Sequence, residues 1–264
     1  MNDQLVLVED AHGVRFITIN RPDAFNSLNR DLRLALLDAF QQAVEDSREP
    51  GRPVRAVVLR AAGKAFCSGQ DLKEQLQDTK TGTGTEKVVE EYNPMVAALL
   101  EIPVPTIAAI QGPAAGAGWG IAMACDFRFM TSAASFKGAF TGVGLAADSG
   151  LSQTLVDTVG RSRALQLLLM DQKISAEEAL QMQLVQSVVD PAELEDVVTQ
   201  FAGKLAMGPT ASYKEMKALV KRAVTVNQAA AAEAEAQKRL FHTRDHSEAV
   251  SAFVEKRRPH FHGK

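Results

Sequence analysis

The sequence has few cysteines, no long apolar run and no excess of charge of either sign. Its 264 residues include only Cys67 and Cys125, which are too few and too far apart for a disulfide scaffold or a zinc site. No window approaches the roughly 18 consecutive apolar residues that a spanning helix needs. A formal charge of −3 excludes the global basic field that binds nucleic acid or an anionic membrane. We therefore expect no metal, no nucleic acid and no membrane among its partners.

The amino terminus also lacks the pattern of a secretory signal. The segment MNDQLVLVED has neither a basic region nor an apolar region of the required length, so a cytoplasmic location is expected. With 46% hydrophobic residues, the chain can bury the core of one large domain or two small ones. These features favour a globular cytoplasmic protein, with enzymes as the leading class.

Periodicity along the chain indicates an α/β architecture. Short strands are expected at 4–9, 14–20, 54–61, 106–112 and 126–132. Helices are expected at about 28–45 and 88–100, and a further apolar helix begins near Trp119. The polar stretch 75–86 is predicted to be a mobile surface segment. Helices dominate the remainder, at 151–158, 161–170, 176–182, 191–206, 210–239 and 245–256.

Two strand-to-helix turns are rich in small residues. They have the sequences FCSGQDL (66–72) and GPAAGAGWG (112–120). Small side chains let the backbone approach a ligand, and unpaired N–H groups at a helix start attract negative charge. If both turns faced one pocket, two N–H groups could converge on a developing oxyanion. The alternative is that the glycines only permit tight turns and close helix packing.

Three well-known nucleotide and nucleophile motifs are missing from these turns. A dinucleotide fingerprint would need glycine where the chain has Ile121. No Gly-Lys-Ser/Thr sequence follows, which excludes a phosphate-binding loop of that type. Neither Ser68 nor Ser149 lies in a G-x-S-x-G elbow, so a serine nucleophile is unsupported.

Four motifs, in order along the chain, resemble the enoyl-CoA hydratase/isomerase (crotonase) superfamily. They are NRP with NSL at 20–28, AFCSGQDL, IQGPAAGAG and FVEKRRPHF. The resemblance implies an α/β fold, the crotonase (ClpP-like) spiral of β-β-α units with a helical C-terminal trimerisation segment. We assign residues 1–205 to the core, with its CoA and catalytic pocket, and residues 206–264 to the oligomerisation segment.

The resemblance also implies ligands and assembly. Members of this family act on acyl-CoA thioesters, so CoA is part of the substrate and no separate cofactor is expected. They are usually homotrimers or dimers of trimers, which is the assembly expected for this chain.

Site residues follow from the same resemblance. The N–H groups of Gln70 and Ala117 are assigned to the oxyanion hole. CoA is placed along Ala24, Ser68, Asp71 and Leu72. Lys256 or Arg257 is placed near the phosphates, the alternative being a solvated C-terminal run of charge. Trp119 and Phe140 are expected to shape the acyl pocket.

The acids distinguish members of this family. Hydratases carry two glutamates, at the positions that hold Gly120 and Phe140 here, which argues against ordinary hydration. Asp148, in GVGLAADSG, is an acid in a suitable place. From the sequence alone it could be an N-cap or a turn aspartate. The resemblance instead implies a single acid/base, in the pattern of the family's phenylacetate-pathway isomerases.

Asp148 is expected to work from an apolar pocket. The residues expected around it are Ala146, Ala147, Phe140 and Trp119. Removal of the carboxyl group from water would raise its pKa and its basicity. A single acid/base of this kind suffices for isomerisation, because no water is added.

The implied activity is isomerisation of an acyl-CoA. The candidate reactions convert ring-1,2-epoxyphenylacetyl-CoA to oxepin-CoA, in phenylacetate catabolism, or 3-enoyl-CoA to 2-enoyl-CoA, in fatty acid metabolism. Enoyl-CoA hydration and a non-catalytic, crotonase-fold binding role stay open as alternatives. The histidines at 12, 242, 246, 260 and 262 are expected at the surface.

Overall fold

The computed structural model describes residues 4–48, 54–81, 86–220 and 223–260. Its main sheet has six strands in the order β1-β2-β3-β4-β6-β9, and every neighbouring pair is parallel except β1-β2. These strands are β1 (Val6–Ala11), β2 (Val14–Ile19), β3 (Ala56–Ala61), β4 (Thr106–Ile110), β6 (Phe127–Thr131) and β9 (Ser187–Val189). A second sheet contains β5 (Ala114–Ala115), β7 (Ser135–Lys137) and β8 (Ile174–Ser175).

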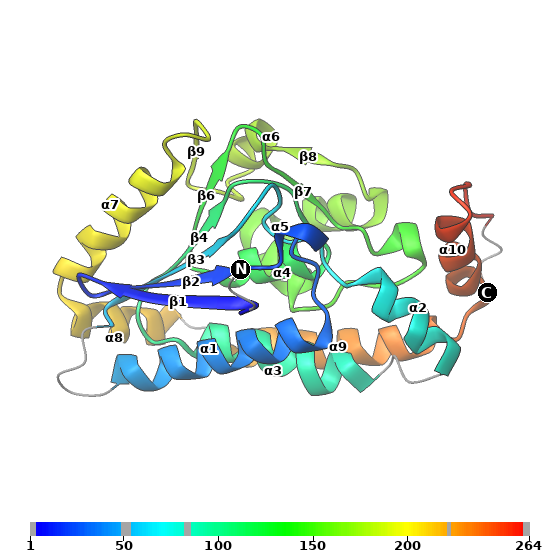
Figure 1. Ribbon diagram of the computed structural model, residues 1–264, viewed down its shortest axis with the longest axis horizontal. Coiled ribbons are helices and arrows are strands. Elements are labelled where there is room, and N and C mark those ends of the chain that lie inside the picture. The colour runs from blue at the N-terminus through cyan, green and yellow to red at the C-terminus, as the bar shows by residue number, and fades with distance from the viewer. Residues whose placement is uncertain (1–3, 49–53, 82–85, 221–222, 261–264) are drawn as a thin grey trace.

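Helices cover both faces of the main sheet. They are α1 (Arg30–Arg48), α2 (Leu72–Thr81), α3 (Asn93–Glu101), α4 (Ala117–Ala124), α5 (Leu151–Met170), α6 (Ala176–Gln181), α7 (Leu194–Met207), α8 (Thr210–Val220), α9 (Ala223–Phe241) and α10 (Arg244–Val254). Three shorter turns are η1 (Pro22–Ala24), η2 (Val88–Tyr92) and η3 (Thr141–Val143). In Figure 1, α1, α3 and α9 run along one side of the molecule, and α7 and α8 lie at the end opposite α10.

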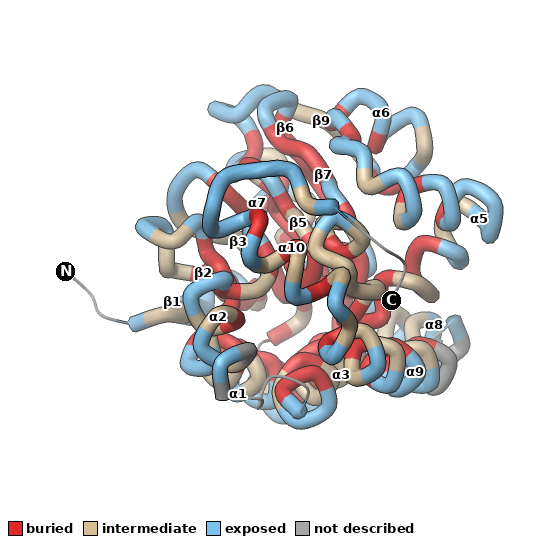
Figure 2. The backbone as a smooth tube through the Cα atoms, turned by 90° about the vertical axis from the view of Figure 1, so that its right-hand side faces the viewer, coloured by how far each residue is buried: buried red, intermediate tan, exposed pale blue. Residues whose placement is uncertain are grey.

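The two-residue period of the strands divides the core into two layers. Phe16, Val58 and Ile107 point to the face that α7 covers. Their neighbours Ile17 and Leu59 point to the opposite face, against α1, α3 and α4. A parallel sheet buried on both faces needs apolar residues at consecutive positions, which β2 and β3 provide. Figure 2 shows these strands as the buried centre of the molecule.

The predicted α/β spiral is confirmed, and the structure corrects several element boundaries. The stretch expected to be a mobile surface segment is helical through Thr81, the last residue of α2, and residues 82–85 lie outside the described ranges. Helix α4 starts at Ala117, two residues before the predicted start. The helices predicted at 151–158 and 161–170 meet in α5 at Gly160, whose φ of 74° and ψ of 161° are not helical.

The C-terminal helices fold back over the rest of the chain. Helix α9 packs along α3 and α5, and α10 packs against η3. The helix expected over 210–239 corresponds to α8 and α9, with residues 221–222 outside the described ranges. The described residues of segment 206–264 therefore lie against the core that holds the cavity described below.

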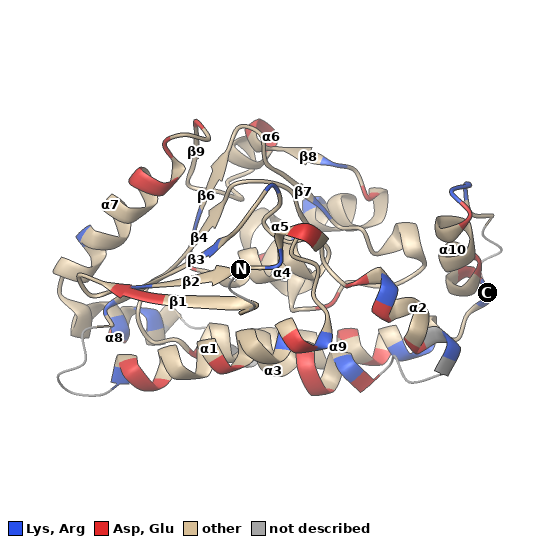
Figure 3. Cartoon of the chain, viewed as in Figure 1, with Lys and Arg blue, Asp and Glu red and all other residues tan. Residues whose placement is uncertain are grey.

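The charged and apolar residues of the helices fit this arrangement. Figure 3 shows basic and acidic residues interspersed along α1, α2 and α9. Within the described ranges, none of the helices combines the length and the apolar character that crossing a membrane requires.

Candidate active site

The two glycine-rich turns lie side by side. Cys67 N–H donates to Pro113 O at 3.3 Å, and Ala115 N–H donates to Cys67 O at 2.9 Å. Gly69 has a φ of +86°, and a Cβ there would lie 2.8 Å from Ala115 O. Only glycine fits a left-handed position with so little space. The small residues of the motifs thus allow one turn to pack directly on the other.

Each turn leaves one backbone N–H free to face a ligand. Leu28 N–H donates to Gly69 O and Asp71 N–H donates to Leu28 O, which turns the N–H of Gln70 away from Leu28. Ala117 is the first residue of α4, where an N–H has no acceptor within the helix. Gln70 and Ala117 line the same cavity, and the N–H groups at the start of a helix carry partial positive charge.

This cavity brings together most of the predicted site residues. It has a volume of about 630 Å³. The predicted residues that line it are Ala24, Ser68, Gln70, Asp71, Leu72, Ala117, Phe140 and Asp148. They come from η1, the first turn, the start of α2, the second turn and the loop before α5, so segments more than 100 residues apart in sequence meet here.

Asp148 lies in this cavity as a buried carboxyl group. Its residue is 5% exposed, and Ser149 Oγ donates to its Oδ1 at 3.0 Å. Burial and the negative charge of Glu233 raise its pKa to about 7, against weaker opposite effects of Ser149, Lys87 and Arg33. The N-cap of α5 is Gly150, so the side chain of Asp148 does not cap the helix. A carboxyl group with this pKa can both accept and return a proton near neutral pH.

The other carboxylates that line the cavity either bond to neighbouring groups or are exposed to solvent. Asp71 Oδ2 lies 2.5 Å from the Arg21 guanidinium. Burial raises the pKa of Asp71, but the hydrogen bond from Arg21 and the other hydrogen bonds to this carboxylate outweigh burial, so the pKa is lowered. Asp171 accepts a hydrogen bond from the loop before η3, and Asp23 is exposed on η1. In the described part of the chain, no cluster of histidine, cysteine or acidic side chains has the arrangement of a metal site. Asp148 is thus the buried carboxyl of this cavity without a cationic partner in contact.

The structure places Trp119 outside this cavity, contrary to the prediction. Its side chain is fully buried and stacks on Phe136, with ring centroids 5.2 Å apart. Every residue of helix α4 is buried, and Trp119 is not among the residues that line the cavity. Trp119 therefore belongs to the hydrophobic core, while Phe140 does line the cavity.

Lys256, predicted near the CoA phosphates, is exposed after α10 and is not part of the cavity lining. Arg257 forms an ion pair with Glu248, with Arg257 Nη1 2.6 Å from the carboxylate. Within one chain these cations do not reach the cavity. Two other lysines, Lys73 and Lys137, line it instead, and both are exposed at its mouth.

His246 was predicted at the surface, but the structure buries it in the cavity wall. The residue is 1% exposed, and its Nδ1 lies 2.9 Å from Val143 O. Because a carbonyl can only accept, we assign the proton to Nδ1, which leaves Nε2 as an acceptor 3.4 Å from Gln75 Nε2. Burial lowers the pKa of His246, so the neutral ring is favoured. Gln75 Oε1 accepts from Lys87 Nζ at 2.8 Å and also from the side-chain amide nitrogen, Nε2, of Gln70.

Other C-terminal residues that line the cavity were missed by sequence reasoning. They are Gln237, Val250 and Phe253, from α9 and α10. Gln237 is 6% exposed, and its Oε1 has no hydrogen-bond partner among the described residues. No local signal identifies them, because their role depends on where the C-terminal helices fold back.

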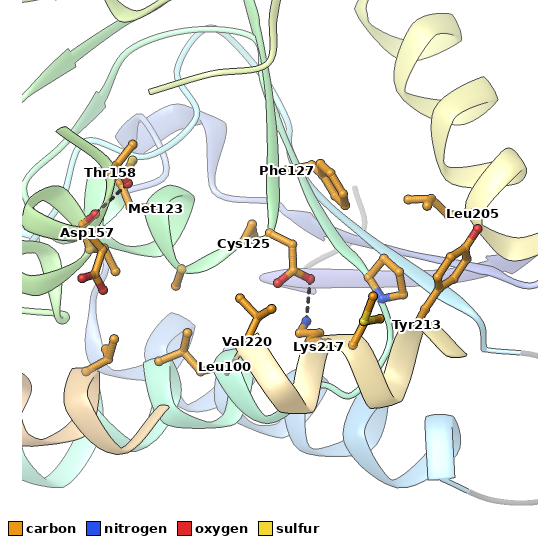
Figure 4. Close-up of a pocket in the computed structure, with 16 residues that line it drawn as sticks. Leu100, Met123, Cys125, Phe127, Asp157, Thr158, Leu205, Tyr213, Lys217 and Val220 are labelled. Atoms are coloured by element: carbon orange, nitrogen blue, oxygen red, sulfur yellow. Dashed lines mark hydrogen bonds and ion pairs between the residues drawn. The ribbon is translucent and has the colours of Figure 1, made fainter. Parts of the chain in front are cut away.

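A second cavity, of about 610 Å³, lies between α8 and the start of β6. Figure 4 shows its mainly apolar walls, with Lys217 of α8 among the labelled side chains. Lys217 Nζ lies 2.6 Å from Asp126 Oδ2. It contains none of the predicted site residues.

The two cysteines show no sign of reactivity, since burial raises the pKa of each thiol to about 12.

Comparison with known proteins assigns the family. Residues 9–264 match the family model described as enoyl-CoA hydratase/isomerase. The chain is 37% identical over 267 residues to a protein of Rhodobacter capsulatus named probable enoyl-CoA hydratase, with 100% of both chains covered. It is 34% identical over 266 residues to the 1,2-epoxyphenylacetyl-CoA isomerase of Escherichia coli, with 99% of both covered.

The fold comparison agrees. The crystal structure of an enoyl-CoA hydratase/isomerase from Pseudoalteromonas atlantica has a TM-score of 0.87 and 31% identity to this chain, and covers 98% of this chain and 100% of its own. The fold is shared over nearly the full length, and two facing turns and a buried acid meet in one cavity. These findings agree on one family. The chain belongs to the enoyl-CoA hydratase/isomerase family and is an enzyme of that crotonase-fold family.

Proposed function

We propose that this enzyme is an acyl-CoA isomerase that works with one acid/base, Asp148. The substrates proposed are ring-1,2-epoxyphenylacetyl-CoA, converted to oxepin-CoA, and 3-enoyl-CoA, converted to 2-enoyl-CoA. One observation carries the proposal: Asp148, with a pKa raised to about 7, lines the same cavity as the N–H pair of Gln70 and Ala117.

The proposed steps need only these groups. Asp148 removes the α-proton of a 3-enoyl thioester while the N–H groups of Gln70 and Ala117 hold the enolate oxygen. The protonated carboxyl then returns the proton at C4, and the double bond moves into conjugation with the thioester. For the ring epoxide, the same acid/base assists opening to the seven-membered oxepin. Each reaction is an isomerisation, so no water enters and no second acid is required.

The surroundings of Gly120 support a single acid. A Cβ at Gly120 would lie 2.7 Å from Ser149 Cβ, and 3.7 Å from the carbonyl oxygen of Asp148. The turn that carries Asp148 therefore occupies the space that a glutamate at 120 would need. Phe140, at the other position where family hydratases carry glutamate, presents an aromatic ring to the cavity.

CoA is proposed to enter along the predicted residues Ala24, Ser68, Asp71 and Leu72. Lys73 and Lys137 at the cavity mouth supply positive charge for its phosphates. The role of Lys256 stays a prediction that requires a neighbouring subunit, because within one chain this lysine lies outside the cavity. The acyl group then extends toward Asp148, His246 and Phe253.

Enoyl-CoA hydration is the second candidate, and one finding favours it. The relative from Rhodobacter capsulatus, 37% identical over the full length, is named a hydratase. Hydration in this cavity would need a group to orient water besides Asp148. Two other buried carboxylates lie nearby: Asp71 is paired with Arg21, and Glu233 does not line the cavity and accepts hydrogen bonds from the start of α5.

The test measures three substrates with the parent enzyme and Asp148→Asn. We expect conversion of 3-enoyl-CoA and of the ring epoxide, no hydration of 2-enoyl-CoA, and a fall in turnover of about 10²- to 10⁴-fold in the variant. Asp31→Asn, which changes an exposed carboxylate at the start of α1, is the matched control. Hydration that survives Asp148→Asn would overturn the proposal, and so would isomerisation that stays within a few-fold of the parent.

A further inference from the structure

Helix α9 presents two buried polar side chains to the loop that carries Asp148. Glu233 and Gln237 are four residues apart and therefore share one face of the helix. Each is 6% exposed, although both residue types are usually found at the surface. A helix assigned from sequence to oligomerisation thus points a carboxylate and an amide into its own chain.

Glu233 caps the helix that follows Asp148. Its Oε2 accepts from Gly150 N–H at 2.9 Å, and its Oε1 accepts from Ser152 N–H at 3.1 Å and from Ser152 Oγ at 2.5 Å. The N-cap of α5 is Gly150, which has no side chain to do this. The carboxylate also complements the positive end of the α5 dipole. The cap of α5 therefore comes from a helix more than 80 residues later in the chain.

Gln237 fixes the other side of the same loop. Its Nε2 donates to Ala146 O at 2.7 Å, two residues before Asp148. Between the two attachment points, Ser149 and Gly150 have φ values of 55° and 70°. A left-handed serine is uncommon and unfavourable on its own, so this turn needs support from outside itself.

We propose that Glu233 and Gln237 are positioning residues that clamp the loop on both sides of Asp148 and hold its carboxyl group in the cavity. The proposal rests on the proposed function, because it takes Asp148 as the acid/base. It gives the C-terminal segment a part in catalysis within its own subunit, beyond any part in assembly.

The clamp also contributes to the charge around Asp148. Glu233 of α9 is the like charge, and the cations that act on Asp148 are Arg33 of α1 and Lys87 at the start of η2. Tyr92 of η2 is neutral at ordinary pH, since burial raises its pKa well above its usual value. Removing the Glu233 charge would leave the two cations, so the pKa of Asp148 would fall.

The experiment compares pH profiles of kcat/KM and kcat for the parent enzyme, Glu233→Gln, Gln237→Met and Asp148→Asn. Glu233→Gln should shift the acid limb to lower pH and lower kcat by about tenfold, with little change in KM. Gln237→Met keeps the charge, so it should lower kcat without moving that limb. Glu235→Gln is the control, because Glu235 is exposed on the same helix and forms an ion pair with Lys238 at the surface.

The outcomes separate the clamp from the proposed function. If Asp148→Asn keeps its activity, the proposed function fails. If Asp148→Asn is inactive but Glu233→Gln and Gln237→Met match Glu235→Gln in kcat and pH profile, the clamp is overturned while the proposed function stands. Circular dichroism establishes that each variant is folded. Should Glu233→Gln not fold, Gln237→Met alone decides, since unchanged kcat in that variant would also refute the clamp.

Discussion

At the scale of single residues, the features that suit Asp148 to proton transfer also oppose folding. An ionised carboxylate without a cation in contact loses its hydration when it is buried. Its pKa is raised from 3.8 to about 7. Between these values the folded protein binds a proton that the unfolded chain has released, so the free energy of unfolding falls as pH rises.

Asp148→Asn is therefore expected to be inactive but more stable than the parent at pH 8. The expected gain in free energy of unfolding is about 2–4 kcal/mol, since the carboxamide carries no charge to desolvate. The gain should shrink at pH 5, where the folded parent is protonated, and urea unfolding at the two pH values measures it. Asp71→Asn should instead lower the free energy of unfolding at pH 8. The pKa of Asp71 is lowered in the folded protein, so its charged form stabilises the fold. Equal gains at both pH values would contradict this account of Asp148.

Gly120 offers a second prediction at this scale. A Cβ at this position would come within 2.7 Å of Ser149 Cβ, so Gly120→Ala must displace the turn beside Asp148. We expect a loss of about 1–3 kcal/mol in free energy of unfolding and at least a tenfold lower kcat.

Gly203→Ala is the matched control for Gly120→Ala. Gly203 lies within α7 and a Cβ there would meet nothing within 4 Å. Alanine should therefore stabilise the helix by about 0.5–1 kcal/mol and leave kcat unchanged. Urea unfolding and steady-state kinetics test both variants, and equal effects of the two substitutions would contradict the steric explanation.

At the scale of elements, α2 depends on its contacts with other helices. Arg33 of α1 is 1% exposed and bonds both to Glu74 of α2, at 2.7 Å, and to Glu91 of η2, at 2.6 Å. Its guanidinium also lies over the ring of Tyr92, 4.8 Å from the centroid. These contacts join three elements beside the cavity. They add tertiary support to a helix that its Leu, Lys, Glu and Gln residues already favour and that the Asp71 side chain caps through the N–H groups of Lys73 and Glu74.

Arg33→Met should loosen this junction. The variant removes a buried cation from two partly buried carboxylates, of which Glu91 keeps its ion pair with the exposed Arg30. We expect a loss of about 3–5 kcal/mol in free energy of unfolding. Glu195→Gln is the control, because its pair with Arg60 is exposed and should contribute less than about 0.5 kcal/mol. Urea unfolding of both variants provides the test, and a loss for Arg33→Met as small as that of the control would refute the role of the junction.

At the scale of the whole molecule, the C-terminal helices contribute to the site. Helices α9 and α10 contribute Gln237, His246 and Phe253 to the cavity of the same chain. Apolar side chains also remain exposed on one chain, among them Leu169 on α5 and Met216 on α8. Exposed groups of this kind are often covered in an assembly.

We predict that the protein forms a homotrimer or a dimer of trimers. Light scattering coupled to size-exclusion chromatography should give a mass three or six times that of one chain across micromolar concentrations. A chain that stays monomeric over this range while isomerising its substrate would contradict the prediction.

The sequence by itself determined the fold family and the two glycine-rich turns, and its resemblance to that family singled out Asp148. Each of these depends on residues close together in the chain: alternating apolar residues specify strands, and small residues at fixed spacing specify turns. The resemblance to the family implied that Gln70, Ala117 and Phe140 meet at one pocket, and all three line the cavity. The prediction of a mobile segment at 75–86 gave too little weight to the helix-forming residues of α2 and to the N-cap at Asp71.

The tertiary structure alone decided which distant side chains face the cavity. Trp119 has the same helical neighbours as Ala117 but points into the core against Phe136. His246 follows a charged segment that reads as surface, yet α10 folds back and buries it. Glu233 reaches the start of α5 in the same way. Sequence patterns report the neighbours of a residue along the chain, whereas burial and the pKa of a buried group depend on neighbours that only the packing of elements brings near.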